Sequence, residues 1–172
     1  SMTLLGKKVA LVGLDIRKPM LASYLDLPTN GSLTSYLADS AYDIDDIIVS
    51  TNITRLDVIP AGIIPPNPSE LLQSNRLDEL FVELRNRYDY IVVDSAPVAM
   101  VSDTFLLSRL VDMTVYVTRA NYTTFELVDF LNQTHEQQRL PKMVAVLNGV
   151  DAKKIGYGYG YGYGQNVKST KR

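Results

Sequence analysis

The 172-residue sequence contains no cysteine and no tryptophan, and it has a single histidine. Without cysteine there is no disulfide framework, no thiolate metal site and no cysteine nucleophile. No uncharged apolar run approaches the roughly 18–20 residues that cross a bilayer as a helix. The opening residues also lack the basic, apolar and small-residue order of a signal peptide. These absences predict a soluble chain whose composition fits a reducing compartment.

Charge is nearly balanced over the whole chain but is unevenly distributed. The formal net charge of −2 gives no general attraction to nucleic acid or anionic lipid. Residues 151–172 carry a net charge of +4, so residues 1–150 carry −6. After Val150 the sequence changes to Gly-Tyr repeats followed by polar and basic residues. We therefore expect a globular domain over residues 1–150 and a flexible, basic Gly/Tyr-rich tail over residues 151–172.

Five short apolar runs predict β-strands that are buried on both faces, because they lack clean alternation between polar and apolar residues. These runs are Lys8–Asp15, Arg55–Pro60, Asp89–Asp94, Asp112–Thr118 and Lys142–Asn148. Helical patterns lie between them: a start signal at Asn67, Pro68 and Glu70 opens a helix that runs to Asn86. Further helices are expected at Met20–Leu25, Leu33–Ala38, Val101–Leu110 and Thr124–Gln138. This alternation predicts an α/β fold with a doubly wound, mostly parallel sheet and helices on both faces.

Two acidic residues follow predicted strands at the edge where such sheets bind ligands. Asp15 ends the first apolar run and Asp94 ends the third. Carboxylates at neighbouring strand ends can share one hydrated Mg²⁺, and Arg17 is close enough in sequence to neutralise phosphate in the same pocket. The alternative is that each acid only caps the helix that follows it. For either acid alone, the sequence leaves both interpretations open.

Four segments together resemble the bacterial tyrosine kinases and cover nearly the whole chain. They are LVGLDIRKP over residues 11–19, VIPAGIIPPNPSELL over 58–72, IVVDSAP over 91–97 and the tyrosine-rich tail. The order of these motifs is that of a P-loop-type ATPase, and kinases of this family use ATP and Mg²⁺. The family forms the cytoplasmic part of polysaccharide copolymerases, which control the export and chain length of capsule and exopolysaccharide. The resemblance implies a location on the cytoplasmic side of the bacterial inner membrane.

The resemblance also implies a role for individual residues. Asp15 and Arg17 match the Walker A′ motif, in which the acid helps to hold Mg²⁺ and to activate the attacking tyrosine hydroxyl. Asp94 matches the Walker B acid and would bind the metal. Asn148 matches the position that contacts adenine in related ATPases. The phosphoacceptors would be the four tail tyrosines, Tyr157, Tyr159, Tyr161 and Tyr163.

The partners implied by the resemblance follow from these roles. The tail of a neighbouring subunit would enter the site in trans, within a ring-like homo-oligomer. The other implied partners are the membrane-embedded copolymerase portion, in the same or another chain, and a tyrosine phosphatase. No nucleic acid is expected as a partner. Four close phosphates would repel one another and leave the acidic pocket of a neighbour, which would dissolve the ring.

The sequence departs from the family pattern in two places. It contains no G-x-x-x-x-G-K-[ST] phosphate-binding loop, so we expect the first strand of the fold to be missing as well. Walker A′ motifs usually carry two acids two residues apart, and the first position here is Gly13. The resemblance therefore predicts an autokinase when intact, but poor ATP binding and little catalysis by these 172 residues.

Two other functions compete with this prediction. The protein could be a non-catalytic scaffold of a polysaccharide export complex, or a partition or cell-division ATPase with the same motifs. The tail would argue against the second, since those proteins tend to end in plain or amphipathic helices. By itself, a Gly-Tyr tail with nearby basic residues also suits stacking on single-stranded nucleic acid or self-association.

The remaining polar features have simpler interpretations. His135 has polar neighbours and no second ligand, so we expect it to face solvent. The acidic cluster around Asp43 is typical of the solvated face of a short helix. The prolines before Asn67 indicate a rigid loop beside the site. Asp103 and Arg119 lie near strand ends or helix starts, but the sequence does not assign them to the site.

Overall fold

The computed structural model describes residues 2–28 and 31–151, so the predicted phosphoacceptor tyrosines lie outside the described residues. The strands are β1 (Val9–Gly13), β2 (Val49–Ser50), β3 (Leu56–Ile59), β4 (Tyr90–Asp94), β5 (Thr114–Arg119) and β6 (Met143–Asn148). All five predicted strands are confirmed, and β2 is an addition that the sequence did not indicate. The two residues of β2 are too few to show a pattern.

The helices follow the predicted order, with differences in type and length. The α-helices are α1 (Leu21–Tyr24), α2 (Leu33–Ala38), α3 (Pro68–Leu72), α4 (Asn75–Arg87) and α5 (Phe125–Glu136). The 3₁₀ helices are η1 (Thr3–Leu5), η2 (Ile44–Asp46) and η3 (Ser102–Arg109). Among the described residues, no helix is both long and apolar enough to span a membrane.

Two predicted helices take a different form in the structure. The helix expected from Asn67 to Asn86 is broken at Gln73 and Ser74 into α3 and α4. The Ser74 hydroxyl donates a hydrogen bond to the carbonyl of Leu71, which ends the first helix and supports the turn. The segment Val101–Leu110, expected as an α-helix, forms the 3₁₀ helix η3 instead.

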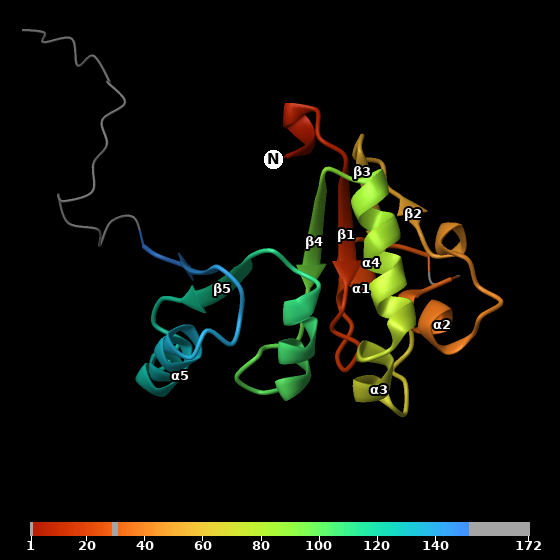
Figure 1. The fold of residues 1–172 in the computed structure, drawn as a ribbon. Coiled ribbons are helices and arrows are strands. Elements are labelled where there is room, and N and C mark those ends of the chain that lie inside the picture. The colour runs from red at the N-terminus through yellow and green to blue at the C-terminus, as the bar shows by residue number, and fades with distance from the viewer. Residues whose placement is uncertain (1, 29–30, 152–172) are drawn as a thin grey trace, which may run out of the picture.

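The α/β class is confirmed, but the strands form two sheets instead of one. The larger sheet has the order β2-β3-β1-β4, in which β1 is parallel to both neighbours and β2 is antiparallel to β3. A second sheet pairs β5 with β6 in parallel. Figure 1 shows β1 and β4 side by side and β5 set apart from them.

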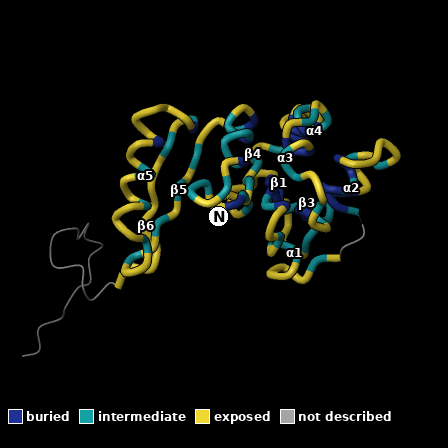
Figure 2. Tube along the Cα trace, turned by 90° about the horizontal axis from the view of Figure 1, so that it is seen from below, coloured by how far each residue is buried: buried dark blue, intermediate teal, exposed yellow. Residues whose placement is uncertain are grey.

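The core lies between β1, β3 and the helices that pack on them. Its side chains are fully buried at Val12 and Ile59 of the sheet and at Leu77, Leu80 and Leu84 of α4. The helical spacing of the α4 residues places them on one face, which is the face that packs on the sheet. Figure 2 shows burial concentrated around β1 and β3, whereas β5, β6 and α5 are mostly exposed. The prediction of strands covered on both faces therefore holds for β1 but is wrong for β4, β5 and β6.

A groove separates the two sheets. Its volume is about 760 Å³, and α4, β4, η3 and β5 all contribute to its walls. Among the described residues, β4 pairs only with β1 and β5 pairs only with β6, so both strand edges along the groove lack a neighbouring strand. Val92 and Val115 line the groove and remain 41% and 51% exposed. We call this feature the β4–β5 groove.

Candidate functional site

The pairing of β1 with β4 brings the two candidate acids to neighbouring strand ends. Gly13 is in register with Asp94, and Asp15 lies two residues further along the chain. The backbone N–H groups of Leu14 and Asp15 donate to the carbonyl of Asp94 at 2.7 and 3.1 Å. Parallel pairing is therefore what sets both carboxylates at the carboxyl edge of the sheet.

Asp15 organises the loop that follows β1. Its Oδ1 accepts hydrogen bonds from the backbone N–H groups of Arg17 at 3.2 Å and Lys18 at 2.9 Å. Among the described residues, its Oδ2 has no hydrogen-bond partner and is available to a ligand. The N-cap of α1 is Met20 and that of η3 is Val101, so the alternative that each acid caps the next helix is wrong.

The electrostatics of Asp94 reflect this arrangement. Partial desolvation at the strand end raises the pKa of Asp94, and the nearby Asp15 carboxylate raises it further. Two carboxylates that disfavour each other's charge are stabilised by a shared cation. Magnesium accepts one or two protein carboxylates and fills its other positions with water and phosphate oxygens. The donor set of Asp15 and Asp94 therefore fits Mg²⁺ without further protein ligands.

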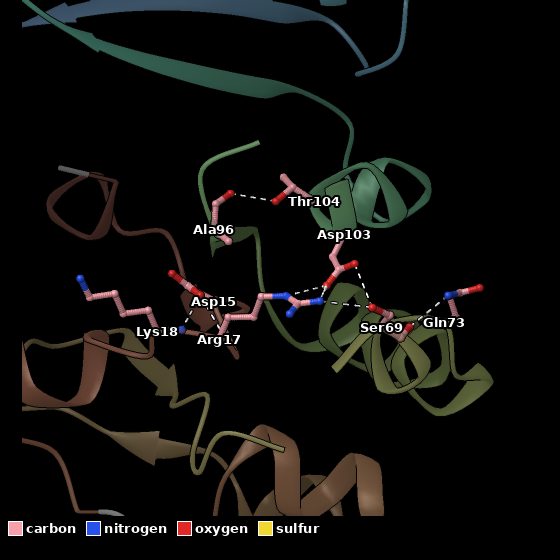
Figure 3. Close-up of polar contacts among 8 residues, drawn as sticks. All are labelled: Asp15, Arg17, Lys18, Ser69, Gln73, Ala96, Asp103 and Thr104. Atoms are coloured by element: carbon pink, nitrogen blue, oxygen red, sulfur yellow. Dashed lines mark hydrogen bonds and ion pairs between the residues drawn. The ribbon is translucent and has the colours of Figure 1, made fainter. Parts of the chain in front are cut away.

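Arg17 extends from the same loop to two residues of other elements. Its Nε donates to Oδ2 of Asp103 at 2.8 Å, and its Nη2 contacts both that oxygen and Oγ of Ser69. Ser69 in turn donates to Oδ1 of Asp103 at 3.0 Å. We call Arg17, Ser69 and Asp103 the Arg17 cluster. Figure 3 shows the Arg17 side chain directed toward Asp103 and Ser69, whereas Lys18 extends away from them.

A small hollow lies beside this cluster at the carboxyl edge of the sheet. Its lining comes from the loop after β1, the loop after β4, α3 and η3, and comprises Leu14, Asp15, Ile16, Arg17, Leu72, Ala96, Val101, Asp103, Thr104 and Leu107. The hollow thus joins Asp15 to the Arg17 cluster. Three segments far apart in sequence meet here, as expected at the ligand-binding edge of an α/β sheet.

The sequence did not assign Asp103 or Ser69 to this site. The available signal was a single acidic residue near the start of the segment Val101–Leu110, which begins shortly after Asp94. Asp103 is only 9% exposed, and buried acids normally need a charged partner. Ser69 gave no comparable signal, because serine is common in the first turn of a helix.

Asn148 lies apart from these residues. It ends β6 in register with Arg119 of β5, and its Oδ1 accepts a hydrogen bond from the backbone N–H of Gly149 at 2.8 Å. Arg119 stacks over the ring of Tyr122, with 5.6 Å between the guanidinium carbon and the ring centre. Neither Asn148 nor Arg119 lines the hollow beside Asp15.

Known proteins resemble this chain in both sequence and fold. No family model matches it. It is 33% identical over 147 residues to the tyrosine-protein kinase CpsD of Streptococcus agalactiae, a match that covers 85% of this chain and 64% of CpsD. This chain therefore spans less than two thirds of the length of that relative. Among solved structures, the kinase domain of VpsO matches with a TM-score of 0.78 and 30% identity, over 87% of this chain and 74% of that one.

A more distant likeness concerns the fold alone. The septum site-determining protein MinD of Pyrococcus horikoshii, solved in complex with Mg-ADP, has a TM-score of 0.66 and 18% identity. That match covers 84% of this chain and 58% of MinD. The likeness to the two kinases thus extends to sequence, and the likeness to MinD does not.

Proposed function

This chain belongs to the bacterial tyrosine kinase family, and from that membership we propose that it supplies the metal- and phosphate-binding edge of an ATP-dependent protein-tyrosine autokinase. The meeting of Asp15 and Asp94 at neighbouring strand ends, with Arg17 beside them, is the observation that carries the proposal. Mg²⁺, when bound, would neutralise charge on the transferring phosphoryl group. Asp15 Oδ2 and the Asp94 carboxylate would hold it.

The other roles that we propose for these side chains concern the attacking tyrosine. A tyrosine hydroxyl has an ordinary pKa of about 10, so it must lose its proton as it attacks. Asp15 would accept that proton, and the guanidinium of Arg17 would stabilise negative charge on the phosphate. Asn148 would contact the base of the nucleotide. These assignments follow the order of the motifs along the chain.

The proposed substrate is the tail of a second copy of the protein. Trans phosphorylation of Tyr157, Tyr159, Tyr161 and Tyr163 would occur within a ring-like oligomer, and a tyrosine phosphatase would reverse it. The intact protein would act at the cytoplasmic side of the bacterial inner membrane, with a membrane-embedded copolymerase portion, to regulate capsule or exopolysaccharide chain length and export. Family membership supports each of these proposals.

We further propose that these 172 residues alone have little kinase activity. They contain no G-x-x-x-x-G-K-[ST] loop, which would provide backbone amides and a lysine for the phosphates. The β4–β5 groove supports this proposal, because a strand paired there in parallel with β4 would end beside Asp94. A phosphate-binding loop after such a strand would face the two acids.

A non-catalytic scaffold is the second candidate, and the residue at position 13 favours it. A β-carbon on Gly13 would lie 3.1 Å from the backbone nitrogen of Ala61 and 3.3 Å from Cδ2 of Leu21. The packing around Gly13 therefore leaves little room for the first Walker A′ acid. If the protein had lost its catalytic function, the loss of one carboxylate from the site is a change that we would expect to find.

Mass spectrometry of the tail decides between the two candidates. The full-length gene product would be incubated with Mg·ATP as wild type, as Asp94→Asn and as Asp112→Asn, whose carboxylate is exposed and does not line the hollow beside Asp15. We expect phosphate on the tail tyrosines in wild type and Asp112→Asn, and none in Asp94→Asn. An unmodified tail in all three folded proteins would instead favour the scaffold. Strong autophosphorylation by the 172-residue chain would contradict the proposal that it is inactive.

A further inference from the structure

The Arg17 cluster contains an acid that the proposed reaction does not use directly. Asp103 is buried, and both of its carboxylate oxygens are occupied: Oδ2 by the Arg17 guanidinium and Oδ1 by the Ser69 hydroxyl. A buried carboxylate with a fixed guanidinium partner is costly to separate from it. Asp103 therefore holds Arg17 in one orientation.

The geometry of the guanidinium shows what this orientation leaves for a ligand. Nε and Nη2 of Arg17 both point at Asp103, and Nη2 also reaches Ser69 at 3.3 Å. Among the residues that the structure describes, Nη1 has no hydrogen-bond partner. One edge of the guanidinium is thus fixed, and the nitrogen outside that edge is available to an oxyanion.

The position of Asp103 is itself fixed relative to the metal-binding acids. The hydroxyl of Thr104, the next residue, donates to the carbonyl of Ala96 at 2.8 Å, and Ala96 lies two residues after Asp94. At the other end, the backbone N–H of Arg17 donates to Asp15. Hydrogen bonds of Thr104, Asp103 and Arg17, linked by the backbone at residues 103–104 and by the side chain of Arg17, therefore connect the loop after β4 with the loop after β1 (Figure 3).

We propose that Asp103, assisted by Ser69, is a positioning residue that fixes the Arg17 guanidinium and leaves Nη1 free to bind the phosphate of the nucleotide. The catalytic role of Asp103 rests on the proposed kinase function, whereas its orientation of Arg17 does not. Asp103 acts only through Arg17. Its removal should therefore matter only while Arg17 is present.

The geometry is tested first in the 172-residue chain by NMR. The Nε–H of Arg17, assigned by its loss in Arg17→Lys, should exchange slowly with water in wild type and at least about tenfold faster in Asp103→Asn. Asp78→Asn is the matched control, because Asp78 accepts a hydrogen bond from Nε of Arg109 at 2.9 Å and neither residue contacts Arg17 or lines the hollow. That variant should leave the Arg17 signal unchanged. Equal exchange of the Arg17 proton in wild type and Asp103→Asn would overturn the proposal.

The role in catalysis is tested by a double-mutant cycle on tail phosphorylation by the full-length gene product. We expect Asp103→Asn to lower kcat by about 10- to 100-fold with a small change in KM for Mg·ATP, because misplaced groups lose rate mainly in the transition state. Asp103→Glu should recover part of the rate. In the Arg17→Ala background, Asp103→Asn should change kcat less than about twofold.

The two arms separate this proposal from the proposed function. Equal losses from Asp103→Asn in both backgrounds would show a merely structural role and overturn the positioning role. If wild type leaves its tail unmodified, the kinase proposal is wrong. The exchange of the Arg17 Nε–H then decides alone whether Asp103 positions Arg17.

Discussion

Introduction of an acid at position 13 is the most informative perturbation of the proposed metal site. Gly13 is in register with Asp94 on the neighbouring parallel strand, so substituents at the two positions point to the same face of the sheet. Gly13→Asp would therefore add a third carboxylate to Asp15 and Asp94. Gly13→Asn is the matched control, since it has almost the same shape and no charge.

The structure sets the size of the effects. Both variants place a β-carbon 3.1 Å from the backbone nitrogen of Ala61. Overpacking of this kind costs about 1–3 kcal/mol, partly offset by about 0.5–1 kcal/mol for removing glycine from a strand. We expect Gly13→Asn to lower the free energy of unfolding by about 1–2 kcal/mol. Without metal, the like charge of Gly13→Asp should cost about 0.2–1 kcal/mol more.

Magnesium should reverse the difference between the two variants. At a Mg²⁺ concentration ten times the Kd, binding stabilises the native state by about 1.4 kcal/mol, which raises Tm by about 3–6 °C in a domain of this size. Calorimetry or circular dichroism would measure Tm with and without Mg²⁺, because the chain has no tryptophan for fluorescence. No Mg²⁺ response in either variant would refute the shared carboxylate site, and an equal response in both would show that an acid at position 13 does not join it.

Two further predictions concern protonation and backbone geometry. Because desolvation and Asp15 raise the pKa of Asp94, charging this carboxyl costs stability in the native state. In metal-free buffer, Asp94→Asn should have the higher urea midpoint at neutral pH, and its advantage should shrink as the pH falls through the pKa of Asp94; a constant difference would contradict this. Gly62→Ala would place a β-carbon 2.0 Å from Oγ of buried Ser32 at φ +92°, whereas Gly6→Ala at φ +79° meets nothing closer than 3.9 Å. Both substitutions put a β-carbon on left-handed backbone, so this cost cancels in the comparison. Gly62→Ala should therefore lower the free energy of unfolding by at least about 2 kcal/mol more than Gly6→Ala in denaturant titrations. Equal losses would show that the contact with Ser32 relaxes freely.

The local sequence pattern was sufficient to predict the strands, because each run is apolar, short and bounded by turn residues. The pattern was not sufficient to predict the helices where only the spacing of apolar residues indicated them. The step from Leu72 to Leu77 spans five residues, which does not fit one continuous helical face, and the structure breaks the helix between them. The segment of η3 gave a weak signal, since Thr104 and Asp103 use their side chains for contacts outside the helix.

The sequence also supported the meeting of Asp15 with Asp94, because both acids end strands and parallel strands end at one edge. It could not show the Arg17 cluster in the same way. Arg17 and Asp103 are 86 residues apart, and Arg17 and Ser69 are 52 apart. Contacts of that separation depend on which loops the sheet order brings together and on the reach of one side chain. No local spacing reports either quantity.

The charges gathered at this edge give the site a preference for the order in which ligands bind. Asp15, Asp94 and Asp103 carry three negative charges against the one positive charge of Arg17, and Asp103 already neutralises Arg17 at 2.8 Å. The pair of carboxylates remains available to a ligand; desolvation raises the pKa of Asp94, and the charge of Asp15 raises it further. A nucleotide without metal would bring more negative charge to that pair, whereas a divalent cation removes the repulsion first. Under the proposed function, the metal-bound nucleotide would therefore be the form that this edge accepts, and Nη1 of Arg17 would serve a phosphate only once the cation has neutralised the two acids.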